Sequence, residues 1–347
     1  MSPPADRHRS HTSDGPPLAR GPEFDLIRRF LPKHTPARPD VRVGPGDDCA
    51  VVAGDGIALS VDMSVEGVHF RRDWLSFREI GGRAAAAALS DLAAMAARPV
   101  GVLVSLAVPR EDAGEPAVEV MEGVRAAAAE VGAVLLGGDL ARTSGPMTID
   151  VTVVGEAPHP VLRSGAAMGD EVWVTGELGG SGLFVEQMLG GWRPSRGARE
   201  RYAAPVPRIA EARWLAERGL VHAMIDLSDG LAGDAAHLAA ASGVAILLAP
   251  ELIPIHPAVR RHATTPGHAL RLAISGGEDY ELCFTATLGE VEGHVHAFQS
   301  AFGTRLTCVG RVSGGDGVWW TDAEGHRQPL GVHGYQHFEQ DDEMPPA

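Results

Sequence analysis

Acidic residues follow a short apolar run in the second half of this sequence, where the chain turns through glycine. The run Ala223–Asp226 is followed by Ser228 and Asp229, and a helix is predicted from Leu231 to Ala241. Carboxylate and hydroxyl oxygens at the end of a strand suit Mg²⁺, which proteins commonly hold between one or two carboxylates and substrate phosphates. The same residues are equally typical of a helix N-cap and a turn. The recurrence of this pattern elsewhere favours a metal site.

Two more groups of oxygen ligands lie in the first quarter of the chain. Asp48 follows Asp47 in a Gly-Pro-Gly turn, and adjacent like charges repel each other unless a cation lies nearby. Ser60 and Asp62 end a predicted strand that begins at residue 57. His69 follows, although histidine is more often a structural hydrogen-bonding residue than a ligand. Asp48, Ser60 and Asp62 therefore extend the predicted cation site.

Asp91 and Asp139 complete the set of candidate ligands. Asp91 lies in the middle of a predicted helix, residues 82–97, that is mostly alanine and leucine. Aspartate is a poor helix former there, and a buried carboxylate without a partner is costly. An exposed position on the polar face is the alternative, but the surrounding alanines favour burial beside a metal. Asp139 follows Gly137 and Gly138, which let a ligand approach the backbone at the end of a predicted strand.

The composition limits the class of protein and of partner. The chain has 347 residues, more than one hydrophobic core usually serves, so two domains are predicted. Its net charge of −15 at pH 7 leaves no basic patch for nucleic acid or an anionic membrane. No apolar run reaches the roughly 18 residues of a membrane span. The three cysteines are scattered and predict neither a zinc site nor a disulfide framework, which fits the cytoplasm.

The order of predicted elements divides the chain into a tail and two domains. Residues 1–21 lack an apolar segment, so a disordered tail is predicted rather than a signal peptide. Residues 22–158 have the order β, β, α, β, α, β, β, which predicts an α+β domain, a mixed sheet with helices on one face. Residues 159–347 predict a second domain of the α/β class.

The second domain contains a glycine-rich segment between a predicted strand, 171–175, and a predicted helix, 181–189. No Lys-Ser/Thr pair follows these glycines, so a simple turn is predicted rather than a phosphate-binding loop. A surface loop is predicted for residues 190–201, and a loop rich in proline and histidine follows a predicted strand at 244–248.

The motifs, taken in order from about Glu23 to Phe338, resemble the thiamine-monophosphate kinase family. They are Gly-Pro-Gly-Asp-Asp-Cys-Ala, Ser-Val-Asp with Gly-Val-His-Phe, Leu-Ser-Asp-Leu-Ala-Ala-Met, Gly-Gly-Asp, Ile-Asp-Leu-Ser-Asp-Gly-Leu and Ser-Gly-Gly-Glu-Asp-Tyr-Glu-Leu. The last two are the most specific. The wider superfamily includes aminoimidazole ribonucleotide synthetase, selenophosphate synthetase and a hydrogenase-maturation protein, which share the two-domain fold and the use of ATP but not these motifs.

The resemblance implies ATP-dependent phosphorylation of thiamine monophosphate to thiamine diphosphate by a cytoplasmic homodimer that uses several Mg²⁺ ions. It also implies that residues 22–158 bind ATP and Mg²⁺ and dimerise, with the amino-terminal domains forming the central sheet structure. The implied Mg²⁺ ligands are Asp48, Ser60, Asp62, Asp91, Asp139, Asp226 and Asp229. The implied ATP contacts are Gly138, Asp139, Arg163 and Ser228, and the implied contacts of thiamine monophosphate are His69, Glu278 and Tyr335. Family members usually have Thr where this chain has Val61, so the site has one hydroxyl fewer.

Two interpretations from other classes stay open. In one, the chain is another ATP-using synthetase of the same superfamily. In the other, it is a catalytically inactive dimer that binds metal. The first is disfavoured because the sequence has no reactive cysteine in an amino-terminal loop, and the second because the acidic motifs are complete. No motif places a base beside a nucleophile, so a covalent phosphoenzyme is not predicted and direct in-line transfer is.

Overall fold

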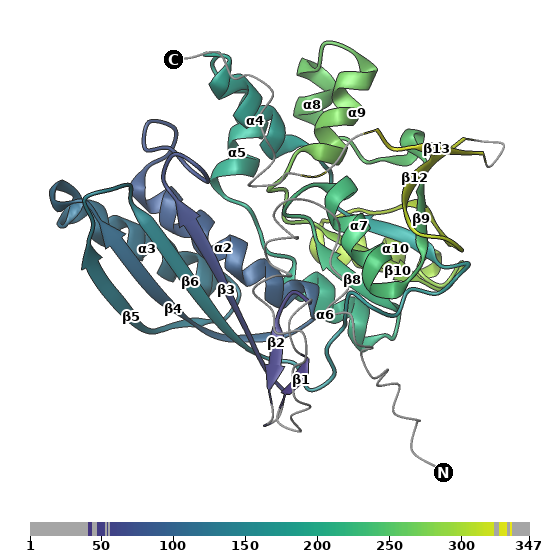
Figure 1. Ribbon diagram of the computed structural model, residues 1–347, viewed down its shortest axis with the longest axis horizontal. Coiled ribbons are helices and arrows are strands. Elements are labelled where there is room, and N and C mark those ends of the chain that lie inside the picture. Colours follow the sequence, from purple (N-terminus) through teal and green to yellow (C-terminus); the bar gives the residue numbers. More distant parts are fainter. Residues whose placement is uncertain are drawn as a thin grey trace.

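The computed structural model describes residues 41–43, 47–52, 54, 56–322, 326–331 and 334, which form two β-sheets with helices (Figure 1). The predicted tail and Tyr335 lie outside these residues. The first sheet has the strand order β1-β2-β3-β6-β4-β5. Its strands are β1 (Val41–Val43), β2 (Ala50–Val52), β3 (Ile57–Val65), β4 (Arg98–Val108), β5 (Val134–Arg142) and β6 (Thr148–Glu156).

Two helices cover one face of the first sheet. Helix α2 (Phe77–Ala94) begins with a capping box in which Ser76 and Glu79 exchange hydrogen bonds, and α3 (Glu115–Glu130) packs beside it. Glycine lets these helices approach closely, because a Cβ at Gly81 would lie 1.9 Å from the Val120 carbonyl oxygen. Both helices lie behind the strands in Figure 1, which confirms the predicted mixed sheet with helices on one face.

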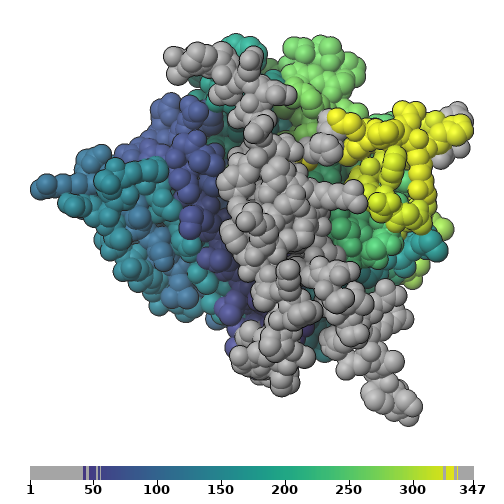
Figure 2. Space-filling view, in the orientation of Figure 1, coloured from purple at the N-terminus to yellow at the C-terminus, as the bar shows by residue number. Residues whose placement is uncertain are grey.

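The other face of the first sheet is open in the described part of the chain. Along β3, Val61 and Met63 are 61% and 52% exposed, and Leu103 on β4 is also exposed. Strand β5 is exposed along its whole length, including Leu140. Strands β3 to β6 reach the surface on this side of the molecule in the space-filling view (Figure 2). The sheet therefore presents apolar side chains to solvent on the face opposite its helices.

The second sheet has the strand order β13-β12-β9-β11-β7-β10-β8. Its strands are β7 (Glu171–Thr175), β8 (Ala223–Asp226), β9 (Ala245–Leu248), β10 (Leu282–Ala286), β11 (Leu306–Ser313), β12 (Gly317–Thr321) and β13 (Arg327–Pro329). The helices of this half are α4 (Gly180–Leu189), α5 (Arg196–Ala203), α6 (Ile209–Glu217), α7 (Leu231–Ser242), α8 (Pro257–His262), α9 (Pro266–Ser275) and α10 (Val295–Phe302). No helix among the described residues is long and apolar enough to cross a membrane.

Three local predictions are wrong. Helix α5 occupies part of the loop predicted at 190–201, and α8 and α9 occupy the segment predicted as a loop rich in proline and histidine. Proline stands at the first turn of α8 and of α9, where it is compatible with a helix because the amide there has no partner within the helix. The predicted end of the strand at Gly137 and Gly138 is also wrong, because β5 continues through them to Arg142.

Helix α2 joins the two halves of the molecule. It packs against β3 and β6 of the first sheet and against β8 and α6 of the second half. One continuous hydrophobic cluster runs from Leu89 and Leu92 of α2 to Leu215 of α6 and Met224 of β8. Side chains of α2 therefore lie beside the end of β8, where the acidic motif stands.

Candidate active site

Three aspartates from distant parts of the chain meet where α2 contacts β8. Asp48 precedes β2, Asp91 lies in α2 and Asp226 ends β8. Each offers one carboxylate oxygen, and these oxygens all lie within 4.8 Å of one another. The group thus draws ligands from both sheets. Buried carboxylates at this spacing repel one another strongly unless protons or a cation neutralise them.

Burial and mutual repulsion raise the pKa values of two carboxylates in the cluster. Burial, and then the charges of Asp226 and Asp48, raise the pKa of Asp91 well above its usual value. Burial and the charge of Asp48 raise the pKa of Asp226 to about 8. Only Asp48 has a basic partner among the described residues of this trio, because Arg163 donates to both of its oxygens at 2.7 and 2.8 Å. Two carboxylates are left for another cation.

The atoms of the cluster that could coordinate a metal are oxygens, which fit a hard divalent cation such as Mg²⁺. Ser60 Oγ donates to Asp91 Oδ2 at 2.5 Å, so the helix-facing side of β3 contributes directly. Asp62 lies on the same side of β3, since it alternates with exposed Val61 and Met63. Burial and the charge of Glu278 raise the pKa of Asp62 to about 6. Asp62 therefore connects the cluster to the residues expected to hold the acceptor.

The turn after β8 adds a second acidic pair. The Asp229 amide donates to Asp234 Oδ2 at 3.1 Å, and Asp234 is buried in the first turn of α7. Burial, followed by the charges of Asp229 and Asp226, raises the pKa of Asp234. Asp234 was not among the ligands predicted from sequence, although an acidic residue in the first turn of a helix is a usable signal. Ser228 accepts the Glu278 amide through its carbonyl oxygen at 2.7 Å.

Asp139 and Gly138 are not brought to the cluster. Pairing across the first sheet aligns Met63, Asp150, Ser105 and Asp139 in one row, on the open face. Asp139 therefore lies on the face opposite Asp91, three strands from β3, which is about 14 Å at the usual strand spacing. Gly138 has a packing reason to be glycine, because a Cβ there would lie 1.9 Å from the Val104 carbonyl oxygen. Their roles as ATP and metal contacts stay predictions.

The residues expected to hold the acceptor lie at the same domain boundary. Glu278 forms an ion pair with Arg83 of α2, and its backbone is in the left-handed region at φ 67°. His69 Nδ1 accepts the Val65 amide at 3.1 Å, and the His69 carbonyl accepts the Tyr202 hydroxyl at 2.9 Å. Arg83 and Tyr202 were not predicted from sequence, since neither residue belongs to a recognised motif.

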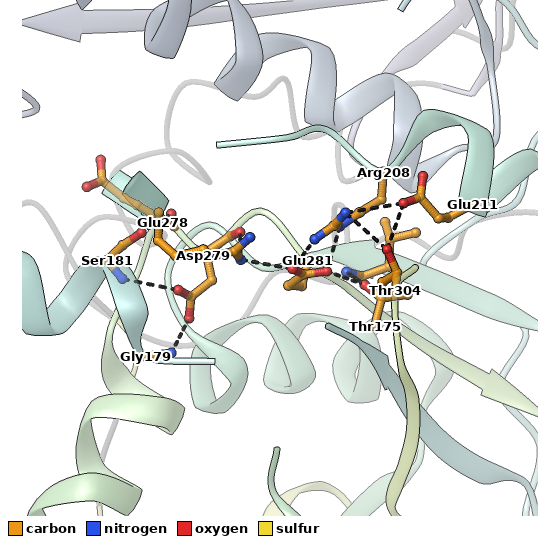
Figure 3. Close-up of polar contacts among 11 residues, drawn as sticks. Thr175, Gly179, Ser181, Arg208, Glu211, Glu278, Asp279, Glu281 and Thr304 are labelled. Carbon is orange, nitrogen blue, oxygen red and sulfur yellow. Dashed lines mark hydrogen bonds and ion pairs between the residues drawn. The ribbon is translucent and has the colours of Figure 1, made fainter. Parts of the chain in front are cut away.

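The loop that carries Glu278 is held from its buried side (Figure 3). Asp279 accepts the amides of Gly179 and Ser181 at 2.5 and 3.3 Å, at the start of α4. The Glu278 side chain points away from these contacts. The loop therefore has one acidic side chain directed to the domain boundary and the next one directed into the fold.

Glu281 anchors the end of the same loop. It accepts from Arg208 Nη2 at 2.5 Å, from Arg201 Nη2 at 2.9 Å and from the Thr175 hydroxyl at 2.7 Å (Figure 3). Burial raises the pKa of Glu281, but the two guanidinium groups outweigh it and hold the pKa at about 2. This buried network fixes the loop to β7 and to the segment between α5 and α6.

Comparisons with known proteins agree with this architecture. Two family models match the chain, "AIR synthase related protein, N-terminal domain" over residues 46–157 and "AIR synthase related protein, C-terminal domain" over residues 167–317. The thiamine-monophosphate kinase of Rhodopirellula baltica is 37% identical over 323 residues, which cover 90% of this chain and 96% of that protein. The chain belongs to the thiamine-monophosphate kinase family. The family's Escherichia coli K12 member is 34% identical over 91% of this chain and 98% of its own length.

Solved structures extend the match to three dimensions. A complex of AaThiL with AMPPCP and TMP superposes with a TM-score of 0.75 at 28% identity, covering 91% of this chain and 96% of that one. The hydrogenase maturation protein HypE, in its complex with HypF, reaches a TM-score of 0.71 at 16% identity, which shows a shared fold alone. Within this fold, membership of the thiamine-monophosphate kinase family therefore rests on the sequence matches.

Proposed function

We propose that this chain transfers the γ-phosphate of ATP to thiamine monophosphate and so forms thiamine diphosphate. The observation that carries the proposal is the trio of buried Asp48, half-buried Asp91 and buried Asp226 at the boundary between the two sheets, in a chain of this kinase family. Phosphoryl transfer between two anionic substrates requires alignment and neutralised charge. Because this protein is acidic overall, the neutralising charge has to come from metal ions or from local arginine side chains.

We infer that the trio holds Mg²⁺, with Ser60, Asp62 and Asp229 as the next oxygen ligands. When bound, Mg²⁺ supplies the positive charge that reduces repulsion between the phosphates of the two substrates. Ser60 orients the Asp91 carboxylate through their hydrogen bond. Arg163 offsets part of the negative charge by its two bonds to Asp48, and we propose that it also contacts ATP, together with Ser228.

The path we propose is direct in-line transfer without a phosphorylated enzyme. Cys49, beside the cluster, is buried, and burial and the neighbouring aspartates raise the pKa of its thiol, so no thiolate nucleophile is provided. The His69 ring nitrogen Nδ1 is occupied by the Val65 amide. The acceptor is already a phosphate anion at neutral pH, so the protein needs to position it rather than activate it.

We propose that the protein works as a homodimer through the open face of the first sheet. Exposed Val61, Met63 and Leu103 give this face an apolar surface that a second copy would bury. Asp139 and Gly138 lie on the same sheet, away from the cluster of their own chain. A dimer through this face would bring Asp139 toward the site of the partner. We place the enzyme in the cytoplasm, which fits its three free cysteines.

The deciding experiment is a coupled assay with ATP, Mg²⁺ and thiamine monophosphate. We expect intersecting initial-rate lines, because both substrates must be bound together, and inversion at a chiral γ-phosphorus. Parallel lines, with label retained on acid-quenched protein after incubation with γ-labelled ATP alone, would overturn direct transfer. No turnover, with Mg²⁺ still raising the melting temperature, would leave an inactive metal-binding dimer.

For the acceptor site, Glu278→Ala should raise KM for thiamine monophosphate or lower kcat. No change in either constant would mean that Glu278 is not part of the acceptor site.

A further inference from the structure

Arg83 is a buried cation at the boundary between the two halves of the molecule. It stands on α2, is 4% exposed, and points toward the second half of the chain. It forms an ion pair with Glu278 and donates to the Tyr202 carbonyl oxygen at 2.7 Å. Its guanidinium carbon also lies 3.8 Å from the centre of the Tyr202 ring. A buried arginine that makes several directed contacts holds its neighbours in a defined geometry.

Tyr202 carries this geometry to the His69 segment. Its hydroxyl donates to the His69 carbonyl oxygen at 2.9 Å. Its ring stacks on Phe184, with centroids 4.4 Å apart, and meets the edge of Trp74. These contacts leave the Tyr202 side chain little freedom, so Arg83 and Tyr202 together form a rigid link between Glu278 and His69.

Glu278 needs such support because its backbone conformation is unfavourable. Its φ of 67° lies in the left-handed region, which costs a non-glycine residue energy, and Tyr280 at φ 49° shares the strain. Its amide and carbonyl are held by Ser228 and by the Ser181 hydroxyl. The side chain is 26% exposed, so its carboxylate remains reachable while Arg83 holds it.

We propose that Arg83 is a positioning residue for the acceptor, which with Tyr202 fixes the Glu278 carboxylate relative to the His69 segment and so sets the affinity for thiamine monophosphate. This inference rests on the proposed function, in which Glu278 and His69 contact the acceptor. The ion pair and hydrogen bond of Arg83 run to Glu278 and Tyr202, and its charge also favours the ionised form of Asp62. Its effect therefore belongs in KM for the acceptor rather than in KM for ATP.

The first test is Arg83→Gln, with Arg83→Lys beside it. Glutamine removes the charge, and lysine retains the charge but loses the planar fork that serves Glu278 and Tyr202 together. Loss of a charged hydrogen-bonding partner typically weakens an interaction by about tenfold or more. We expect KM for thiamine monophosphate to rise about tenfold in Arg83→Gln and less in Arg83→Lys, with KM for ATP within about twofold of wild type.

The matched control is Arg199→Gln. Arg199 of α5 pairs with Glu79 of α2 at 2.9 Å, so it also joins α5 to α2, but it is 42% exposed and does not contact Glu278. We expect this variant to keep both KM values. An equal rise in KM for the acceptor in Arg199→Gln would assign the effect to general loosening of the α2–α5 contact and overturn the proposal.

A double-mutant cycle separates positioning from a structural role. In a Glu278→Gln background, Arg83→Gln should raise KM for the acceptor clearly less than the tenfold expected in wild type, because one of the two residues that it positions has lost its charge. A full tenfold further rise, or a loss confined to kcat that follows the melting temperature, would refute the proposal. If Arg83→Gln fails to fold, Tyr202→Phe decides the question, since it removes only the hydroxyl bonded to His69. It should raise KM for the acceptor and spare KM for ATP, and unchanged KM for both would refute the link.

The same assay keeps this inference apart from the proposed function. Turnover of thiamine monophosphate by the wild-type enzyme supports the function whatever Arg83 does. Wild-type turnover with acceptor KM unchanged in Arg83→Gln would refute the inference alone. No wild-type turnover would overturn both.

Discussion

Replacing Glu281 by glutamine tests the buried ion-pair network that holds the loop of the second half. The substitution keeps the size of the side chain and an oxygen that can accept the Thr175 hydroxyl, but it removes the charge that faces Arg201 and Arg208. The Glu281 side chain is 1% exposed and its pKa falls from 4.5 to about 2. At about 1.36 kcal/mol for each tenfold change in proton affinity, this fall corresponds to about 3 kcal/mol. Breaking a buried ion pair by removing one partner costs about 3–5 kcal/mol, which agrees.

Urea unfolding at pH 7 measures this loss directly. We expect the free energy of unfolding of Glu281→Gln to be about 3 kcal/mol below wild type. Because the folded pKa is lower than the unfolded one, the difference is constant above the unfolded value of 4.5 and shrinks as the pH falls toward 2. Glu217→Gln is the control, since Glu217 makes an exposed surface pair with Arg213 and should change stability by less than about 0.5 kcal/mol. A loss below about 1 kcal/mol in Glu281→Gln would refute the reasoning.

Three further predictions concern the cluster and the open sheet face. Asp91→Asn should reduce kcat far more than it lowers the melting temperature, because it removes a charge that repels its neighbours, and near-normal turnover at saturating Mg²⁺ would contradict the metal assignment. In the presence of a chelator, the wild-type free energy of unfolding should fall as the pH rises from about 4 toward 8, because the raised pKa of Asp226 makes the folded state bind more protons than the unfolded state. Added Mg²⁺ should reduce this fall. A free energy of unfolding that does not change with pH in urea titrations would contradict the raised pKa of Asp226. Met63→Glu should convert a dimer to monomers in sedimentation or light scattering, because it places a charge in the apolar face, while an unchanged dimer would move the interface elsewhere.

The sequence predicted those parts of the molecule whose signal is local. The strands β7 and β8 have the predicted bounds, because each is a short apolar run that a polar turn follows. Asp48, Asp91 and Asp226 were chosen as ligands from carboxylates at strand ends and in an alanine-rich helix, and the fold brings those three together. The useful signal was an adjacent pair of carboxylates in a glycine turn for Asp48 and a carboxylate at a strand end for Asp226, whereas Asp91 alone stood against its local preference.

Residues that act through distant contacts gave no such signal. Arg83 looks like an ordinary helix residue, and only the packing of α2 against the second half reveals its partner Glu278. Gly137 and Gly138 resemble a turn, yet pairing with β4 keeps them in a strand, because tertiary hydrogen bonds outweigh the local preference of glycine. The short helices α8 and α9 begin with proline, which sequence patterns cannot easily distinguish from a loop.

The position of Asp139 on the open sheet face has a genetic consequence. If Asp139 completes the site of the partner subunit, a protomer lacking Asp91 and a protomer lacking Asp139 are each inactive as homodimers for different reasons. A mixed dimer then has one site with both defects and one site with neither. Random reassortment of equal amounts should restore about a quarter of the wild-type activity from two dead proteins. Two inactive alleles of this kind would complement each other in one cell, whereas two alleles altered at Asp91 and Asp226 would not, because every site would keep at least one defect.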